Sequence, residues 1–478
     1  MSSSKSAFSA VRWTTASTIG KTFLQFIQVI VLARLLTPGD FGLMAIVLTV
    51  VTFLQGLSDL GLSSAIIHHQ DTSERELSGL YWLNLAVASS MSLIIAACSP
   101  LVAWFYGDPR LTNMLALAGF TLAASAIGQQ LRVRAERALN FMPLAIIELS
   151  SASIGLAAAA LVAFHTRSAL ALVVGLLASA ISLSVLSWRF LSHGWRPMRT
   201  FCLADTRRLI SFGGYASISN VVGMINMQLD VAIGGRIFEA SELGAYSMAR
   251  DLSLRLASIT NPIFTRVGFP LMAQQHHEKE NVCRVYGRIL EILSALNFPL
   301  YLGVAFFSTE IIQVFFGSHW EAAAPLLSFM AIWGMLRSMM NPVGSLLYAC
   351  GQAKKAFQWN VSLFFLSLPS VLIGCQWGTK GLVLAQVCLM LFVFNFAWKY
   401  LIQPDTGMTL HSYLSRFLPS LALSCVTVLI CWLSVIPFNR SDTRLGLAFL
   451  MACIIYPTIS WYWNRSWMNS IRDVIRKV

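Results

Sequence analysis

Long apolar runs alternate with short polar connections along almost the whole chain. A helix needs about 20 mostly apolar residues to cross the hydrocarbon core of a membrane. Runs of that length recur too often for a soluble core, so the pattern predicts an all-α integral membrane protein with fourteen transmembrane helices. Their predicted ranges are 13–35, 42–66, 80–104, 111–131, 144–164, 168–188, 209–236, 243–270, 288–312, 322–346, 357–376, 381–401, 413–436 and 443–463.

Composition supports a membrane protein and argues against a soluble enzyme. The chain has 478 residues, of which 56% are hydrophobic and only 12% are charged. A soluble domain carries roughly 25% charged residues, so this chain has too few polar side chains to cover a surface that faces water. The net charge of +13 could suit nucleic acid, but the basic residues lie in short loops, so we expect membrane lipids and no nucleic-acid partner.

The distribution of basic residues predicts the orientation. Of the lysines and arginines in loops, 22 fall on one set of alternating loops and 7 on the other. Cytoplasmic loops are enriched in lysine and arginine, so both termini are predicted to lie in the cytoplasm. The residues from 464 onward have the pattern of an interfacial amphipathic helix, with a frayed tail as the alternative.

An internal repeat organises the prediction further. A shift of 202 residues aligns Arg34 with Arg236 and Gly42 with Gly244, and a shift of 210 aligns the segments 105–107 and 315–317. These matches predict two six-helix bundles, 1–200 and 201–403, related by a parallel pseudo-twofold repeat. The remainder, 404–478, supplies two extra helices and the tail. Paired bundles of this kind enclose a central cavity in transporters of the MATE type.

Charged residues within predicted spans are the candidates for function. A charge at the bilayer centre costs about 3 kcal/mol, so such residues usually face a water-filled cavity or a partner. Glu148 and Glu291 lie near cytoplasmic span ends and are interpreted as snorkelling. The candidate cavity cations are Lys21, Arg250, Arg255, Arg266 and Arg337, and the candidate cavity acids or ion-coupling residues are Asp59, Asp230 and Asp251.

The span 243–270 concentrates this signal. Asp251 and Arg255 are four residues apart and share a helical face, whereas Arg250 points some 140° away from Arg255. In the first repeat copy the equivalent positions hold Thr49, Phe53 and Leu48, so the shared scaffold does not require the charges. They indicate either a cationic cavity for an anionic substrate or a salt-bridge network that only holds helices together. Asp230 has two interpretations as well, a cation site or a partner for Arg236.

No chemistry of an enzyme is evident in the sequence. The nine cysteines are scattered without a CxxC or Cys/His cluster, so neither a metal site nor a disulfide framework is predicted. We find no nucleophile–base pair and no glycine-rich loop that would cradle a phosphate, so no catalytic residue and no cofactor is expected.

Two segments resemble a known family. The run Ala33–Leu43 (ARLLTPGDFGL), followed by Ser58–Leu62 (SDLGL), is similar to the amino-terminal signature of polysaccharide exporters. Phe212–Asp230 and Leu243–Tyr246 resemble the same family. These exporters are lipopolysaccharide biosynthesis flippases of the colanic-acid type, within the multidrug/oligosaccharidyl-lipid/polysaccharide (MOP) superfamily.

The resemblance implies a flippase rather than an enzyme. Such proteins move undecaprenyl-diphosphate-linked oligosaccharides across the bacterial inner membrane by alternating access, for exopolysaccharide, capsule or lipopolysaccharide synthesis. The implied partners are the lipid-linked oligosaccharide, a coupling ion (H⁺ or Na⁺), a polysaccharide polymerase and a chain-length regulator. The family's cavity cations would correspond to Lys21, Arg250 and Arg255. The alternatives are a multidrug or cation antiporter of the same superfamily, which would need an acidic cavity, and a membrane polysaccharide polymerase or glycosyltransferase.

Overall fold

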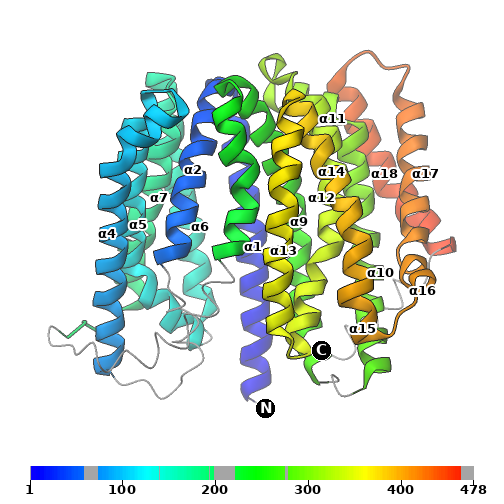
Figure 1. Cartoon of the computed structure of the whole chain (residues 1–478), viewed down its shortest axis with the longest axis horizontal. Helices are drawn as coiled ribbons and strands as arrows, with labels where there is room; N and C mark the ends of the chain where they lie inside the picture. The colour runs from blue at the N-terminus through cyan, green and yellow to red at the C-terminus, as the bar shows by residue number, and fades with distance from the viewer. Residues whose placement is uncertain are drawn as a thin grey trace. The chain divides into compact units, whose positions relative to one another are not determined.

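The structure is a computed structural model that describes residues 2–58, 74–138, 140–192, 194–198, 221–274 and 278–463. Within these ranges every regular element is helical (Figure 1). The chain divides into two compact units, Met1–Gly244 and Ala245–Val478. The boundaries of the repeat halves at residues 200 and 403 stay a prediction.

The first unit contains long helices that lie side by side (Figure 1). Helix α6 packs on α7 and α1, while α5 packs on α4 and α7. The helices are α1 (Ser2–Leu35), α2 (Pro38–Ser58), α4 (Glu74–Tyr106), α5 (Arg110–Arg137), α6 (Phe141–Thr166), α7 (Leu170–Leu191) and a helix over 221–237.

Helix α9 (Ala240–Gln274) begins in the first unit and continues into the second. The remaining long helices are α10 (Lys279–Phe306), α12 (Ala323–Ala349), α13 (Ala353–Cys375), α14 (Gly378–Ala397), α17 (Leu418–Val435) and α18 (Ser441–Trp463). Short elements connect them: α11 (Ser308–Ile311), a π-helical turn Ile312–Phe316, a 3₁₀ turn Ser318–Trp320, a π-helical turn Trp398–Ile402, α15 (Gln403–Thr406) and α16 (Leu410–Ser415).

Twelve helices among the described residues are long and apolar enough to cross a membrane. They coincide with twelve of the fourteen predicted spans, so an all-helical, multispan membrane protein is confirmed. The other two predicted spans are 209–236, of which only the part from 221 is described, and 243–270, which lies within α9. Helix α9 is long enough to cross, but its described residues contain no stretch as apolar as those of the twelve, and the helix runs through Pro262 and Pro270 without a break.

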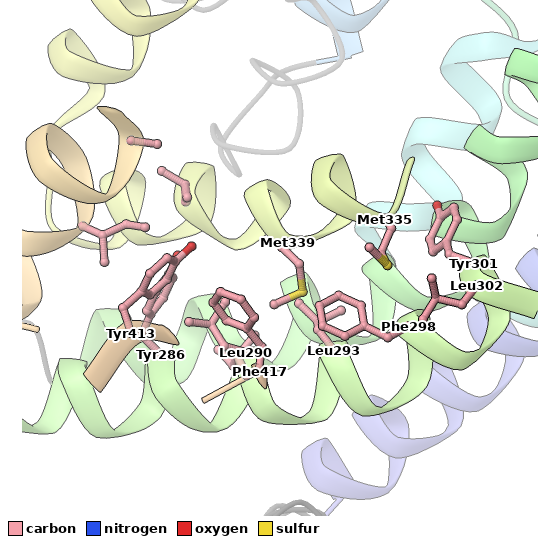
Figure 2. Packing of buried hydrophobic residues seen from close by; sticks show 14 of the residues in the cluster. Tyr286, Leu290, Leu293, Phe298, Tyr301, Leu302, Met335, Met339, Tyr413 and Phe417 are labelled. Atoms are coloured by element: carbon pink, nitrogen blue, oxygen red, sulfur yellow. The ribbon is translucent and has the colours of Figure 1, made fainter. Parts of the chain in front are cut away.

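The second unit is built around large buried side chains. Phe298 and Tyr301 of α10 lie beside Met335 and Met339 of α12, and Tyr286 of α10 belongs to the same cluster (Figure 2). Tyr413 and Phe417 reach the same cluster from the region of α16 and α17. The Phe298 and Phe417 rings make an edge-to-face contact at 6.2 Å. This aromatic core fixes α10 and α12, which are also the helices that hold α9.

Reciprocal contacts join the first turns of α2 and α9. A Cβ atom on Gly42 would overlap the carbonyl oxygen of Ala240, and one on Gly244 would overlap the carbonyl oxygen of Pro38. Both glycines therefore allow a backbone approach that no other residue permits. The repeat shift of 202 residues relates Gly42 to Gly244 and Pro38 to Ala240, so each contact is the counterpart of the other. A twofold relation between the two turns has this property. Gly107 and Gly317, aligned by the shift of 210, likewise share a positive φ of 78° and 91°.

The start of α2 explains part of the signature motif. Thr37 precedes the helix, and the backbone N–H and hydroxyl of Thr37 donate to the Asp40 carboxylate at 3.0 and 2.7 Å. The backbone N–H of Asp40 donates in return to the Thr37 hydroxyl at 3.4 Å. With Pro38 at the first helical position, this is a capping box. The threonine, proline and aspartate of the motif thus start a helix.

Candidate functional site

One face of α9 is packed against its own unit. Tyr246 accepts a hydrogen bond from Gln386 of α14 at 2.8 Å. Two turns further along α9, the Ser253 hydroxyl donates to the Met330 carbonyl of α12 at 2.6 Å. The Tyr301 hydroxyl of α10 donates to the Ser253 carbonyl at 3.0 Å. Tyr246, Ala249 and Ser253 are fully buried. Their spacing places them on one side of the helix.

The predicted charged face lies on the other side of α9. At 100° per residue, Asp251, Arg255 and Ser258 are centred roughly opposite Tyr246 and Ser253. The Asp251 side chain is 46% exposed, Arg255 is half-buried, and Ser258 is exposed. The negative charge of Asp251 interacts with Arg255 one turn away. The packing contacts on α10, α12 and α14 therefore leave these charged residues on a less covered face.

Arg250 has different surroundings from Arg255. Its side chain is only 8% exposed, and its Nη1 atom lies 3.8 Å from a carboxylate oxygen of Asp251. This burial agrees with the angular separation expected from the helical spacing. Arg250 thus lies toward the packed face of α9.

Arg337 lies on α12, next to the contact between α9 and α12. Its guanidinium group stacks over the ring of Trp333, with 5.2 Å between the guanidinium carbon and the ring centroid. A cation–π contact of this kind orients the guanidinium group without neutralising its charge. Gly334 packs directly against Ser253 and Tyr301, so Arg337 belongs to the same helix cluster as the charged face.

Lys21 lies on α1 in the first unit. It is half-buried and makes no hydrogen bond or ion pair with any residue that the structure describes. One turn earlier, the Ser17 hydroxyl donates to Glu148 of α6 at 2.9 Å. Glu148 is therefore tied to α1 by a hydrogen bond, which the snorkelling interpretation did not anticipate. The assignment of Lys21 to a ligand site stays a prediction.

Asp230 is buried in the helix over 221–237, and its carboxylate accepts a hydrogen bond from the backbone N–H of Val231 at 2.9 Å. Its alternative partner, Arg236, instead lies over the ring of Phe105, 5.7 Å from the centroid. The ion pair between these two residues is thus not formed. Of the other candidates, Asp59 lies outside the described residues, and for Arg266 only the helical backbone is described.

Sequence reasoning missed one ion pair. Glu291 of α10 was interpreted as snorkelling, but its side chain is only 12% exposed and lies 2.6 Å from the Nη1 atom of Arg416. That interpretation is wrong, because the partner comes from a segment 125 residues away in the chain. A further pair joins α11 and α18, where Arg444 lies 3.5 Å from Glu310. The two pairs connect the segments around α17 and α18 to the earlier helices of the second unit.

Among the described residues, no group of three or more His, Cys, Asp or Glu side chains is placed to hold a metal ion. The described candidates are positive: Lys21 of α1 in the first unit and, in the second unit, arginines of α9 and α12. Guanidinium and ammonium groups of this kind bind phosphate and carboxylate groups.

Comparisons with known proteins define the class. The family model described as polysaccharide biosynthesis protein matches residues 31–325. The chain therefore belongs to this family, and the resemblance to polysaccharide exporters of the MOP superfamily is confirmed. It is a transporter with many membrane spans, not an enzyme.

Individual relatives agree over nearly the whole chain. The chain is 30% identical over 458 residues to the teichuronic acid biosynthesis protein TuaB of Bacillus subtilis, covering 95% of this chain and 94% of TuaB. It is 28% identical to the lipopolysaccharide biosynthesis protein WzxC of Escherichia coli, covering 88% and 86%. Among solved structures, the lipid II flippase MurJ in an inward closed conformation matches with a TM-score of 0.77 at 12% identity, covering 96% of this chain and all of MurJ. That likeness shows the fold.

Proposed function

We propose that this protein flips a lipid-linked oligosaccharide from the cytoplasmic to the periplasmic leaflet of the bacterial inner membrane. The names of its relatives support this proposal, because TuaB and WzxC serve the biosynthesis of surface polysaccharides and MurJ flips lipid II. The single observation that carries it is the charged face of α9, with Asp251 and Arg255 turned away from the packing contacts of that helix.

The chemistry of the substrate fits this face. An undecaprenyl diphosphate carries negative charge and a hydrophilic glycan, neither of which can enter hydrocarbon unassisted. Arginine binds a diphosphate through paired hydrogen bonds, and lysine contributes a point charge. Arg255 and Lys21 are the contacts we assign to the diphosphate or to acidic sugars. Arg250, Arg266 and Arg337 add positive potential, and Asp59, Asp230 and Asp251 balance these charges or take up a coupling ion.

The proposed architecture has fourteen spans. The segments 209–236 and 243–270 are the two spans beyond the twelve apolar helices, and they are polar because they line the transport route. Two six-helix halves, 1–200 and 201–403, would enclose the cavity and alternate in access, with both termini in the cytoplasm. A proton or sodium gradient would drive the cycle, and a polysaccharide polymerase with a chain-length regulator would consume the product.

The direct test is leaflet-resolved transport of a purified lipid-linked glycan in vesicles that contain the protein. The variant Arg255→Gln keeps much of the side-chain volume and removes the charge. We expect it to insert normally and to lose transport by a factor of about 100, which corresponds to about 2.7 kcal/mol. The matched control is Arg284→Gln, which removes an exposed arginine of α10 that pairs only with Glu280 at 3.5 Å.

Normal transport by Arg255→Gln would contradict the assignment of Arg255. A chain that expels cationic drugs but moves no lipid-linked glycan would overturn the function itself in favour of an antiporter. The two results are independent, because drug export is measured on the unaltered protein.

A further inference from the structure

A second polar site lies at one end of the second unit, away from the charged face of α9. Asp405 is in α15, directly after the π-helical turn Trp398–Ile402. Its side chain is buried, with only 9% of the residue exposed. Gln352, which precedes α13, donates a hydrogen bond from Nε2 to the Asp405 Oδ1 atom at 2.5 Å. Segments 53 residues apart thus meet through two polar side chains.

Both residues also carry an oxygen atom that lacks a donor. Asp405 Oδ2 and Gln352 Oε1 are buried and make no hydrogen bond within the described part of the chain. Turning the amide of Gln352 over would not help, because Oε1 would then face Oδ1, and two acceptors would still be unsatisfied. Asp405 makes no ion pair with a described residue either. A buried carboxylate with one neutral hydrogen bond is costly.

We propose that Asp405 and Gln352 form a proton-binding site. One proton on Oδ2 donates to Gln352 Oε1 and closes a ring of two hydrogen bonds, with Nε2–H donating to Oδ1 and Oδ2–H donating to Oε1. This single addition gives both unsatisfied oxygens a partner and removes the buried charge. A metal ion would need several more oxygen ligands than these two atoms supply.

The neighbouring titratable groups are compatible with this site. Cys350, at the end of α12, lies within electrostatic reach of Asp405: burial chiefly raises the pKa of its thiol, and Asp405 raises it further when the carboxyl is ionised. Lys355 of α13 acts on the same thiol in the opposite direction. From α10, the Lys279 ammonium group donates to the Pro404 carbonyl at 3.0 Å, beside Asp405 rather than to it. These lysines make loss of the proton possible once the site opens to water.

The site joins α15 to the turn between α12 and α13, and α12 also carries Arg337. Release of the proton would leave an ionised carboxylate that must gain water, so α15 and this turn would have to separate. If the protein is the flippase proposed above, this makes Asp405 a candidate for coupling a proton gradient to movement. The proton-binding site itself does not depend on the identity of the transported lipid.

The first test uses the purified full chain in lipid nanodiscs without substrate. Infrared difference spectra across a pH titration should show a protonated-carboxyl C=O band that is absent from Asp405→Asn. Because the folded protein would then hold a proton that the unfolded chain has already released above about pH 4, its stability falls as the pH rises from there to the release point of the folded protein. Asp405→Asn supplies an amide donor in place of the acid, so it should keep the unfolding temperature and lose this pH dependence.

Two further variants complete the test. Gln352→Leu removes both hydrogen-bonding groups and should lower the unfolding temperature. Asp442→Asn is the matched control, because Asp442 is exposed at the start of α18 and should change neither the band nor the pH profile. An unchanged band in Asp405→Asn, or specific stabilisation of the unaltered protein by Na⁺ over K⁺ that this variant abolishes, would overturn the proposal. Each outcome is read without transport, so it is separate from failure of the flippase function.

Discussion

Helices α2 and α9 occupy equivalent positions in the predicted internal repeat but differ in chemistry. Their first turns make the same backbone contacts, through Gly42 in one and Gly244 in the other. From the second turn onward they diverge: α2 carries Leu48, Thr49 and Phe53 where α9 carries Arg250, Asp251 and Arg255. Helix α2 is apolar enough to span a membrane by composition, and α9 is not.

This difference separates scaffold from function. Both helices keep the small residue that their crossing requires, so that part of the pattern serves folding. Beyond the first turn, where Asp40 caps α2, only α9 carries charges, although a charge within the membrane costs several kcal/mol. A feature that is costly and confined to one copy is best explained by a task that the shared fold does not perform. The following predictions test the shared part first and then the differences.

The largest loss of stability is expected from adding a side chain where the first turns of α2 and α9 cross, at Gly42 or Gly244. Gly42→Val should abolish the folded protein, because the added atoms would overlap the Ala240 main chain, and overpacking costs about 3 kcal/mol or more when neither side can yield. Gly244→Val should behave in the same way. Monodisperse yield after size-exclusion chromatography measures the effect. Gly446→Ala in α18 is the control, since nothing lies near the added methyl group. A well-folded Gly42→Val would refute the crossing.

The next effect concerns the charged face itself. The double variant Asp251→Thr, Arg255→Phe gives α9 the residues found at the equivalent positions of α2. We expect unchanged or higher membrane yield, because charges are removed from a span, and at least about 100-fold slower glycan transport, equivalent to about 2.7 kcal/mol. Thr49→Ser and Phe53→Leu in α2 should leave transport within twofold. Equal rates for the two sets would remove the distinction between the helices.

A smaller effect is expected at the ion pair that holds the additional helices of the second unit. Glu291→Gln leaves Arg416 without its carboxylate, and the partial exposure of Arg416 limits the loss of stability to about 1–2 kcal/mol. Thermal unfolding measures it, and adding Arg416→Gln should recover part of the loss. Arg284→Gln, on the same helix but exposed, should cost less than about 0.5 kcal/mol. Equal losses of stability in Glu291→Gln and Arg284→Gln would show that burial of the ion pair is not the cause.

The N-terminal caps of α2 and α9 should also differ in their contribution to stability. Thr37→Ala removes the capping box of α2 and should lower stability by about 1 kcal/mol. The equivalent position before α9 is Glu239, and no such box is formed there among the hydrogen bonds of the described residues. Ser241→Ala, at an exposed site in the first turn of α9, should therefore be neutral in the same unfolding assay. A neutral Thr37→Ala would contradict a capping role.

The smallest effect is a response to acid in the first copy. Hydrogen bonds from Arg110 lower the pKa of Asp108 below its ordinary value. The folded protein therefore binds this proton less readily than the unfolded chain, so the stabilisation is present above about pH 4 and is lost as the pH falls through the lowered value. Arg110 is exposed and Asp108 only partly buried, so solvent screening limits the effect to less than about 0.5 kcal/mol. Asp108→Asn should flatten the acid limb of the unfolding profile slightly; an unchanged limb would argue against it.

The sequence predicted the fold better than it predicted the site. Twelve spans were recognisable because apolar length is a property of each segment alone. Helical spacing also separated the surroundings of Arg250 and Arg255, since both lie on one helix. Contacts between distant segments were not predictable in this way. The pairing of Glu291 with Arg416, and the meeting of Asp405 with Gln352, depend on which helices become neighbours, and hydropathy carries no information about that.

The crossing of α2 and α9 also has a genetic consequence. The atoms that exclude a side chain at Gly42 and Gly244 are carbonyl oxygens of the main chain, which every amino acid possesses. Replacing the opposing residue with a smaller one cannot make room, unlike in an ordinary core, where a neighbouring truncation can relieve a clash. A search for second-site suppressors of either glycine variant should therefore recover true revertants, or changes elsewhere that shift a whole helix, and none at the opposing position.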